Sequence, residues 1–286
     1  MKKTISKFRK PMAKRLLPVR RFEDNKASAG RCLIVAGSDG MFGAAILAAT
    51  AAARVGVGYV TLLTQAQKFP TFKSPDFLLM DLKKIKILKN TFSAVAIGPG
   101  LGRTTSALNA LKYLLKSKIQ NVVVDADALN LCAEYRILKF PSTWILTPHE
   151  GELARLLNVS SEKIRQNRRE YVWKAHQKMG CVVVLKGYKT LVACDQKIYE
   201  IQSGNPALAK AGTGDVLTGM ITGFLAQGLS SDQAACLGAY VHGKVADDWL
   251  KDKKDVLSLM ASDLLNLLPR TMAQIRGGSS AALFKG

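Results

Sequence analysis

The chain has 286 residues, of which 48% are hydrophobic and 22% are charged, and its formal net charge at pH 7 is +21. This apolar content is sufficient for one large domain or two small ones. No apolar run reaches the ~18 residues that cross a bilayer, and residues 1–30 lack the apolar core of a secretory signal. The composition therefore predicts a soluble globular enzyme or binding protein and no membrane partner.

Short continuous apolar runs alternate with helical patterns along the chain. Continuous apolar strands separated by helices are typical of a parallel sheet that is covered on both faces. We therefore expect an α/β fold with three α/β/α layers and a mostly parallel sheet. No linker, repeat or low-complexity stretch interrupts the pattern, so we expect one domain. The expected strands are Cys32–Ala36, Tyr59–Leu63, Ala94–Ile97, Val122–Val124, Trp144–Leu146 and Cys181–Leu185.

Nearly every expected strand ends in residues that bend the chain or carry chemistry. Ligands of parallel sheets bind beyond the carboxyl ends of the strands, so we expect the functional site at this edge. These endings are Gly37-Ser38-Asp39-Gly40, Gly98-Pro99-Gly100, Asp125-Ala126-Asp127, Thr147-Pro148-His149 and Lys186-Gly187.

Taken singly, each of these endings also has an ordinary structural interpretation. His149 precedes a helical pattern and is equally compatible with a helix N-terminal turn. Lys186 is equally compatible with a surface lysine. The segment 98–102 lacks the GxGxxG spacing and also suits a plain turn. Asp125 and Asp127 are compatible with loop shaping, water-mediated metal binding or helix capping.

The most specific segment is 204–215, which contains Gly212-Thr213-Gly214-Asp215 and runs into an apolar helical pattern over 216–226. A Gly-Thr-Gly turn at a helix N-terminus presents unobstructed backbone N–H groups to a phosphate or a phosphoryl group in transfer. Asp215 is compatible with a helix-capping acid. It is also compatible with a general base for a hydroxyl that attacks phosphorus. The absence of GxxxxGK[ST] excludes a P-loop.

The Gly-Thr-Gly-Asp turn resembles the anion hole and catalytic aspartate of the ribokinase-like superfamily. The string Asn205-Pro206-Ala207-Leu208-Ala209 before it is similar to one branch, the NAD(P)H-hydrate dehydratases. The resemblance extends over about residues 16 to 270, and five further motifs follow in the family's order. They are Gly37–Leu62, Ala96–Gly102, Val123–Asn130, Ile145–Leu157 and Val183–Ala193.

The resemblance implies a nucleotide-dependent lyase that repairs the S form of hydrated NADH and NADPH. ADP or ATP, with Mg²⁺, would phosphorylate the ring hydroxyl, and loss of phosphate would restore the double bond. The resemblance also implies that the ordered domain is 16–286, so residues 1–15 are expected to be a disordered basic tail. It implies a homotetramer, for which 233–245 is a candidate surface, although core packing explains that helix equally well.

The family's residue roles carry over where the motifs match. Asp215 would be the catalytic base, and the amides around Gly212, Thr213 and Gly214 would hold the phosphoryl group. The implied nucleotide-binding residues are Lys186, Gly187, Tyr188, Lys189, Thr190 and Gly214. The implied dinucleotide-binding residues are Ala44, Gly100, His149 and Asp215.

The epimerase domain of related proteins is not expected in this chain, so we expect a separate epimerase. Five scattered cysteines, without a Cys-x-x-Cys pair, predict a reducing cytoplasm and no protein-made metal site. One alternative is a small-molecule kinase of the same superfamily, acting on a hydroxymethylpyrimidine, pyridoxal or a sugar. The other is a nucleic-acid binder, suggested by the net charge alone. No basic block interleaved with aromatic residues supports it, so no nucleic-acid partner is expected.

Overall fold

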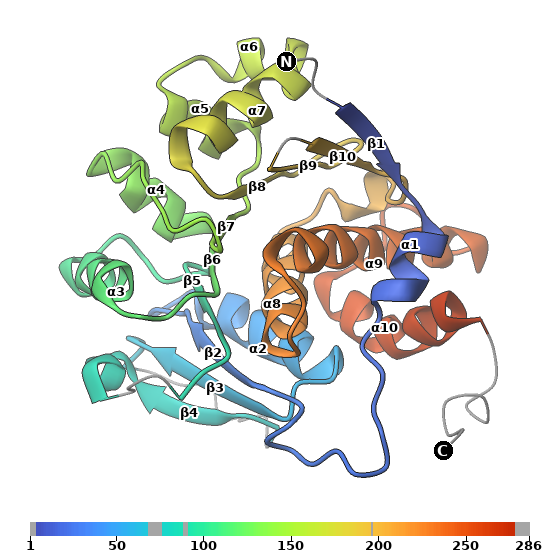
Figure 1. Ribbon diagram of the computed structural model, residues 1–286, viewed down its shortest axis with the longest axis horizontal. Helices are drawn as coiled ribbons and strands as arrows, with labels where there is room; N and C mark the ends of the chain where they lie inside the picture. The colour runs from blue at the N-terminus through green and yellow to red at the C-terminus, as the bar shows by residue number, and fades with distance from the viewer. Residues whose placement is uncertain (1–3, 68–75, 88–90, 196, 278–286) are drawn as a thin grey trace.

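A ten-stranded sheet forms the middle layer of the molecule (Figure 1). The computed structural model describes residues 4–67, 76–87, 91–195 and 197–277. The strand order is β1-β10-β9-β8-β7-β6-β5-β2-β3-β4. The strands are β1 (Thr4–Phe8), β2 (Arg31–Val35), β3 (Tyr59–Thr64), β4 (Leu78–Asp81), β5 (Ala94–Ile97), β6 (Val122–Val124), β7 (Ile145–Leu146), β8 (Val182–Leu185), β9 (Leu191–Cys194) and β10 (Lys197–Ile201).

The sheet is mostly parallel, as the continuous apolar runs predicted. All neighbours from β4 across to β8 run parallel, whereas β9 is antiparallel to both β8 and β10. The six expected strands all form, and two of them have the expected bounds. Between the second and third expected strands, residues 63–94 lie partly outside the described residues. In the described part of this interval, the additional strand β4 pairs with β3.

Helices cover both faces of the sheet, which confirms the three-layer prediction. One apolar core joins the sheet to α1 (Lys10–Leu16), α2 (Phe42–Arg54), α8 (Thr213–Ala226), α9 (Ser231–Lys251) and α10 (Ala261–Arg276). The other face packs against the remaining helices. They are α3 (Thr105–Lys116), α4 (Ala126–Glu134), α5 (Glu150–Leu157), α6 (Ser161–Gln166), α7 (Arg168–Met179) and η1 (Leu82–Ile87), with η2 (Pro206–Leu208) in the loop before α8.

The helices α2 and α8 pack closely because small residues line their contact. A Cβ on Gly219 of α8 would overlap the carbonyl oxygen of Ala48 on α2. The helix α9 packs on α8 in the same core, and the side chains of its 234–243 stretch are buried. Core packing is therefore the interpretation of the apolar 233–245 pattern that the structure supports.

The N-terminal segment differs from its prediction. Described residues 4–15, expected to be part of a disordered tail, contain β1 and most of α1. Strand β1 pairs in parallel with β10 from Thr4–Lys197 to Phe8–Ile201. Phe8 is buried against Tyr199 and Tyr240, and Ala13 is fully buried. The prediction of a disordered tail is wrong here because a few buried side chains and an available sheet edge outweigh the lysines and arginines between them.

Candidate active site

The Gly212–Asp215 turn is the centre of the site, and several hydrogen bonds hold it in place. Gly212 has a φ of 87°, a left-handed conformation that permits the sharp entry into α8. The Thr213 hydroxyl donates to the carbonyl oxygens of Leu208 and Lys210, both at 2.9 Å. Because the first N–H groups of a helix have no intrahelical partner, this turn presents donors where an anion can bind.

Asp215 lies part-buried in the first turn of α8. Burial raises its pKa from 3.8 to about 7, and repulsion by Asp125 adds to the rise, whereas the ammonium of Lys186 opposes it. A carboxyl group that titrates near neutral pH can accept a proton efficiently from a substrate hydroxyl. The geometry therefore suits a general base better than a helix cap alone.

Lys186 lies beside the turn and is mostly buried, with 18% of its side chain exposed. Its Nζ donates to Asp125 Oδ1 at 2.8 Å and lies 3.7 Å from Glu152 Oε2. Burial lowers the pKa of Lys186, but the two carboxylates outweigh that effect and raise it above the ordinary value. A Cβ placed on Gly214 would be 3.5 Å from Nζ. Lys186 is therefore a fixed cation next to the turn and not an exposed surface lysine.

Asp125 is the buried counterpart of Lys186. Only 1% of the residue is exposed, and its second carboxylate oxygen accepts a 2.7 Å hydrogen bond from the hydroxyl of Thr218, one turn after Asp215. It begins α4 but makes no side-chain capping bond. Asp127 Oδ2 accepts from the N–H of Gly102 at 2.8 Å, which shapes the loop after β5.

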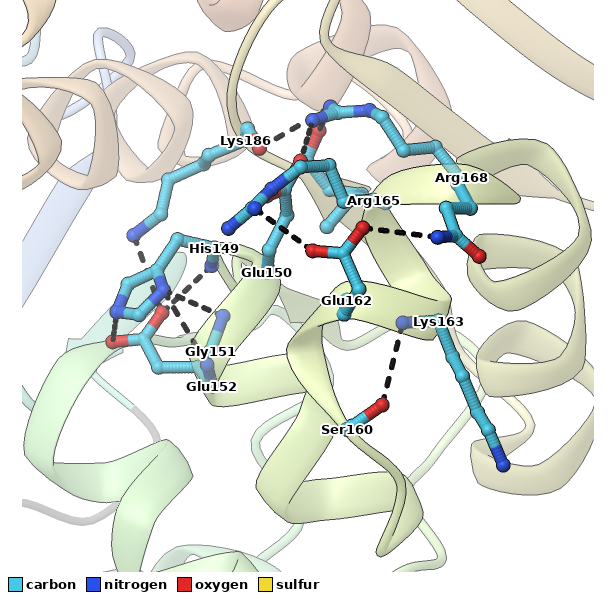
Figure 2. Close-up of polar contacts among 12 residues, drawn as sticks. His149, Glu150, Gly151, Glu152, Ser160, Glu162, Lys163, Arg165, Arg168 and Lys186 are labelled. Atoms are coloured by element: carbon cyan, nitrogen blue, oxygen red, sulfur yellow. Dashed lines mark hydrogen bonds and ion pairs between the residues drawn. The ribbon is translucent and has the colours of Figure 1, made fainter.

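His149 occupies the N-cap of α5 (Figure 2). Its Nδ1 accepts from the N–H groups of Gly151 and Glu152 at 3.0 and 3.4 Å. The backbone N–H of His149 donates to Glu152 Oε2 at 2.8 Å, which completes a capping box. The N-terminal-turn interpretation is thus realised, and 53% of the imidazole remains exposed. A dinucleotide contact of the exposed ring stays a prediction.

Ala44 and Gly100 lie side by side. A Cβ on Gly100 would be 3.0 Å from the Cβ of Ala44. One turn along α2 from Ala44, Leu47 packs against Gly212, since a Cβ on Gly212 would be 2.7 Å from Cδ1 of Leu47. The small residues predicted to contact the dinucleotide are thus near one another and are joined through α2 to the phosphate-binding turn.

A cleft of about 390 Å³ adjoins the Gly212–Asp215 turn, whose Thr213 and Gly214 line it. This volume is within the range of small-molecule sites. All six residues predicted to bind the nucleotide line it. Its lining is Lys186, Gly187, Tyr188, Lys189, Thr190, Ser203, Gly204, Asn205, Pro206, Leu208, Ala209, Thr213, Gly214, Leu217, Ala239, His242 and Gly243.

Three residues of the site were not predicted from the sequence. Thr218 anchors Asp125, and Asp247 accepts from the side-chain amide of Asn205 at 3.0 Å. His242 Nε2 donates to the carbonyl oxygen of Thr213 at 2.9 Å, and burial lowers the pKa of this histidine to about 4. A buried histidine on an apolar helix was a signal for His242. The other two carried none, because only the fold brings their partners to them.

The carboxylates of the site are oxygen donors of the kind that Mg²⁺ prefers. Among the described residues, no group of three or more histidine, cysteine or acidic side chains is placed to hold a metal ion by itself. Two of the carboxylates, Asp125 and Asp127, raise the pKa of Asp215, so this edge would accommodate an additional cation. The residues thus fit a cation that takes further ligands from a bound phosphate.

Comparison with known proteins identifies the family. The family described as NAD(P)H-hydrate dehydratase matches residues 32–270. The chain belongs to this family. A family member from Neisseria meningitidis, an ADP-dependent (S)-NAD(P)H-hydrate dehydratase, is 40% identical over 79% of each chain. A bifunctional NAD(P)H-hydrate repair enzyme from Moorella thermoacetica is 38% identical over 91% of this chain and 52% of that protein. The chain thus spans about half the length of the bifunctional relatives.

Solved structures of the family share the fold. The ADP/ATP-dependent NAD(P)H-hydrate dehydratase of Bacillus subtilis, co-crystallised with ATP/Mg²⁺, is 32% identical with a TM-score of 0.83 over 94% of this chain and 98% of that chain. A ribokinase-like superfamily protein from Enterococcus faecalis has a TM-score of 0.85 at 25% identity, over 96% and 97% of the two chains. The ribokinase-like prediction is therefore confirmed. No helix among the described residues is long and apolar enough to span a membrane.

Proposed function

We propose that the chain converts the S forms of hydrated NADH and NADPH back to NADH and NADPH, with ADP or ATP as phosphoryl donor. The observation that carries this proposal is that the Gly212–Asp215 turn contacts both sets of predicted residues. Asp215 lies part-buried in this turn, and Gly214 lines the cleft together with Lys186. Gly212 packs against Leu47, one turn along α2 from Ala44. The names of the relatives from Neisseria and Bacillus support the same reaction.

The reaction needs a better leaving group than hydroxide. In the proposed first step, Asp215 accepts the proton of the ring hydroxyl while the hydroxyl oxygen bonds to the terminal phosphorus of the nucleotide. The bond from that phosphorus to the bridging oxygen breaks, and AMP leaves when ADP is the donor, or ADP when ATP is the donor. The N–H groups of the 212–214 turn stabilise the charge of the transferring group. In the second step the ring C–O bond breaks, phosphate leaves, and loss of a ring proton restores the double bond.

Lys186 and Mg²⁺ would share the neutralisation of phosphate charge. The Lys186 ammonium is held next to Gly214 by Asp125 and Glu152. Mg²⁺ would be held by phosphate oxygens together with the carboxylate of Asp127 at this edge, and would stabilise negative charge on the phosphates.

The test is recovery of the absorbance of reduced nicotinamide from purified S-hydrate, with Mg²⁺ and either nucleotide. We expect recovery with wild type and a loss of about 10³-fold in kcat with Asp215→Asn, which removes the base. Asp232→Asn removes a half-buried acid in the first turn of α9 that does not line the cleft. This variant is the control and should retain wild-type rates. Accumulation of a stable phosphorylated product would contradict the dehydratase and favour a small-molecule kinase.

The cellular setting is also proposed. We propose a cytoplasmic location, supported by five free, buried thiols and no disulfide among them. We propose a homotetramer and a separate epimerase that supplies the S hydrate. Light scattering of the purified chain tests the first of these two. Conversion of R-hydrate by this chain faster than spontaneous epimerisation would contradict the second.

A further inference from the structure

Arg168 is placed where the helix dipole does not favour it. It is the first residue of α7, directly followed by Arg169, and cations are disfavoured at a helix N-terminus. Both arginines pair with a carboxylate, Arg168 with Glu150 at 2.5 Å and Arg169 with Glu200 at 2.8 Å. The two differ in burial: 16% of the Arg168 side chain is exposed, against 58% of Arg169.

The half-buried guanidinium of Arg168 contacts the start of the nucleotide loop, 186–190 (Figure 2). Its Nη2 donates to the carbonyl oxygens of Leu185 and Lys186 at 3.2 and 3.3 Å. Gly187 has a φ of 125°, and a Cβ there would lie 2.7 Å from Arg168 Nη1. The loop therefore leaves β8 in close contact with this side chain, with no room for an atom between them.

The other side of the guanidinium is tied to the helix that begins beside His149. Nη1 donates to Glu150, the first residue of α5, and Arg165 lies 3.5 Å from the second oxygen of that carboxylate. The planar fork of an arginine can hold a carboxylate and two carbonyls at once, which a lysine cannot reproduce. Arg168 thus joins the N-terminus of α5 to the loop that carries Lys186.

We propose that Arg168 is a positioning residue that fixes the nucleotide loop, with Glu150 as its anchor, so that Lys186 and the cleft-lining backbone are in place before the nucleotide binds. This inference rests on the proposed function in assigning the cleft to the nucleotide. Without Arg168, the carbonyls of Leu185 and Lys186 lose their donor and the loop becomes free to change its path. Part of the binding free energy is then used to order it.

The experiment compares Arg168→Met with Arg169→Met, two variants that each remove one arginine–carboxylate pair from the first turn of α7. We expect Arg168→Met to raise the Kd for ADP, measured by calorimetry without hydrate, by about tenfold. The nucleotide KM should rise equally, with kcat and the hydrate KM changing less than about twofold. Arg169→Met should leave the Kd within about twofold. Arg168→Lys, which keeps charge but not the fork, should give an intermediate Kd.

Melting temperatures separate positioning from stability. If both methionine variants melt at similarly lowered temperatures and only Arg168→Met weakens ADP binding, the inference is supported. Equal ADP affinities of the two variants would overturn it. Should Arg168→Met fail to fold, Glu150→Gln removes the anchor charge alone, and an unchanged Kd there would also overturn it. Wild type that binds ADP but restores no NADH would refute the proposed function, while the ADP affinities would still decide the role of Arg168.

Discussion

The two sides of the site are constructed in different ways. On the nucleotide side, five consecutive residues, 186–190, form one loop held by donors from Arg168 and closed by the hydroxyl of Thr190 on the carbonyl oxygen of Gly187. On the dinucleotide side, the predicted contacts Ala44, Gly100 and His149 follow three different strands, and two of them have no polar side chain. One side depends on hydrogen bonds that fix a loop, and the other depends on space that small residues leave.

This difference predicts different sensitivities. Nucleotide binding should weaken when a donor or a charge is removed, because carbonyls and carboxylates then lose their partners. Hydrate binding should weaken when atoms are added, because the backbone there has no room for them. Lys186 lies between the two, since its ammonium contacts both Asp125 and Glu152, and Glu152 in turn forms the capping box with His149.

The largest effect is expected where both sides meet. Lys186→Met should lower the free energy of unfolding by about 3 to 5 kcal/mol, because it leaves the buried carboxylate of Asp125 without its cation. The double variant Lys186→Met/Asp125→Asn should recover part of this loss, since the charge of Asp125 is removed together with its partner and only Glu152 still lacks the ammonium. Urea unfolding measures both. If the single and the double variant unfold at the same urea concentration, the unpaired charge of Asp125 is not the cause of the loss in stability.

An intermediate effect concerns pH. The pKa of Asp215 is raised from 3.8 to about 7 in the folded state, so the folded chain binds more protons than the unfolded chain between these values. Its stability contribution is present below this window and is lost as pH rises through about 7. The free energy of unfolding of Asp215→Asn should therefore exceed that of wild type by about 3 to 4 kcal/mol at about pH 8, and the two should become equal only at about pH 4. If the difference in free energy of unfolding between the variant and wild type, measured in urea, does not depend on pH, the raised pKa is contradicted.

The smallest effect tests the role of space. Gly100 has a φ of 55°, and a Cβ there would lie 2.5 Å from the carbonyl oxygen of Met41. Gly100→Ala should raise the hydrate KM by about tenfold while the ADP Kd stays within about twofold. Gly43→Ala, on the same helix as Ala44 but with nothing within 4 Å of an added Cβ, is the matched control and should be neutral. If Gly100→Ala changes only the affinity for ADP, Gly100 belongs to the nucleotide side and the prediction is contradicted.

The parts of the fold predicted from the sequence are those that local pattern determines. Val122–Val124 and Ala94–Ile97 are strands with the predicted bounds, because strands buried on both faces must be continuously apolar. The grouping of 186–190 at one site was also predictable, because these residues are consecutive, and they all line one cleft. Their contact with a nucleotide stays a prediction. The prediction failed at β1, where only Phe8 is buried and the pairing partner, β10, lies almost two hundred residues away.

The supporting residues of the site could not be predicted for the same reason. Thr218 and Asp125 are 93 residues apart in the chain, and His242 is 29 residues from the carbonyl of Thr213 that it contacts. Arg168 and Arg169 are adjacent in the chain, and no local pattern distinguishes them. Only the packing of α7 against β8 shows that the first is half-buried at the loop and the second pairs with β10. Contacts of this kind depend on topology, and no local pattern encodes them.

The strand β1 has a consequence for association with other chains. It covers the edge of β10, whose last residues lead into the lining of the nucleotide cleft. The family match begins at residue 32 and does not include it. A sheet edge left open offers unpaired N–H and C=O groups to any extended peptide, including the same strand of another copy. In this protein β1 takes the edge position in place of β10, and its exposed Lys7 is a charge of the kind that disfavours pairing with a further strand.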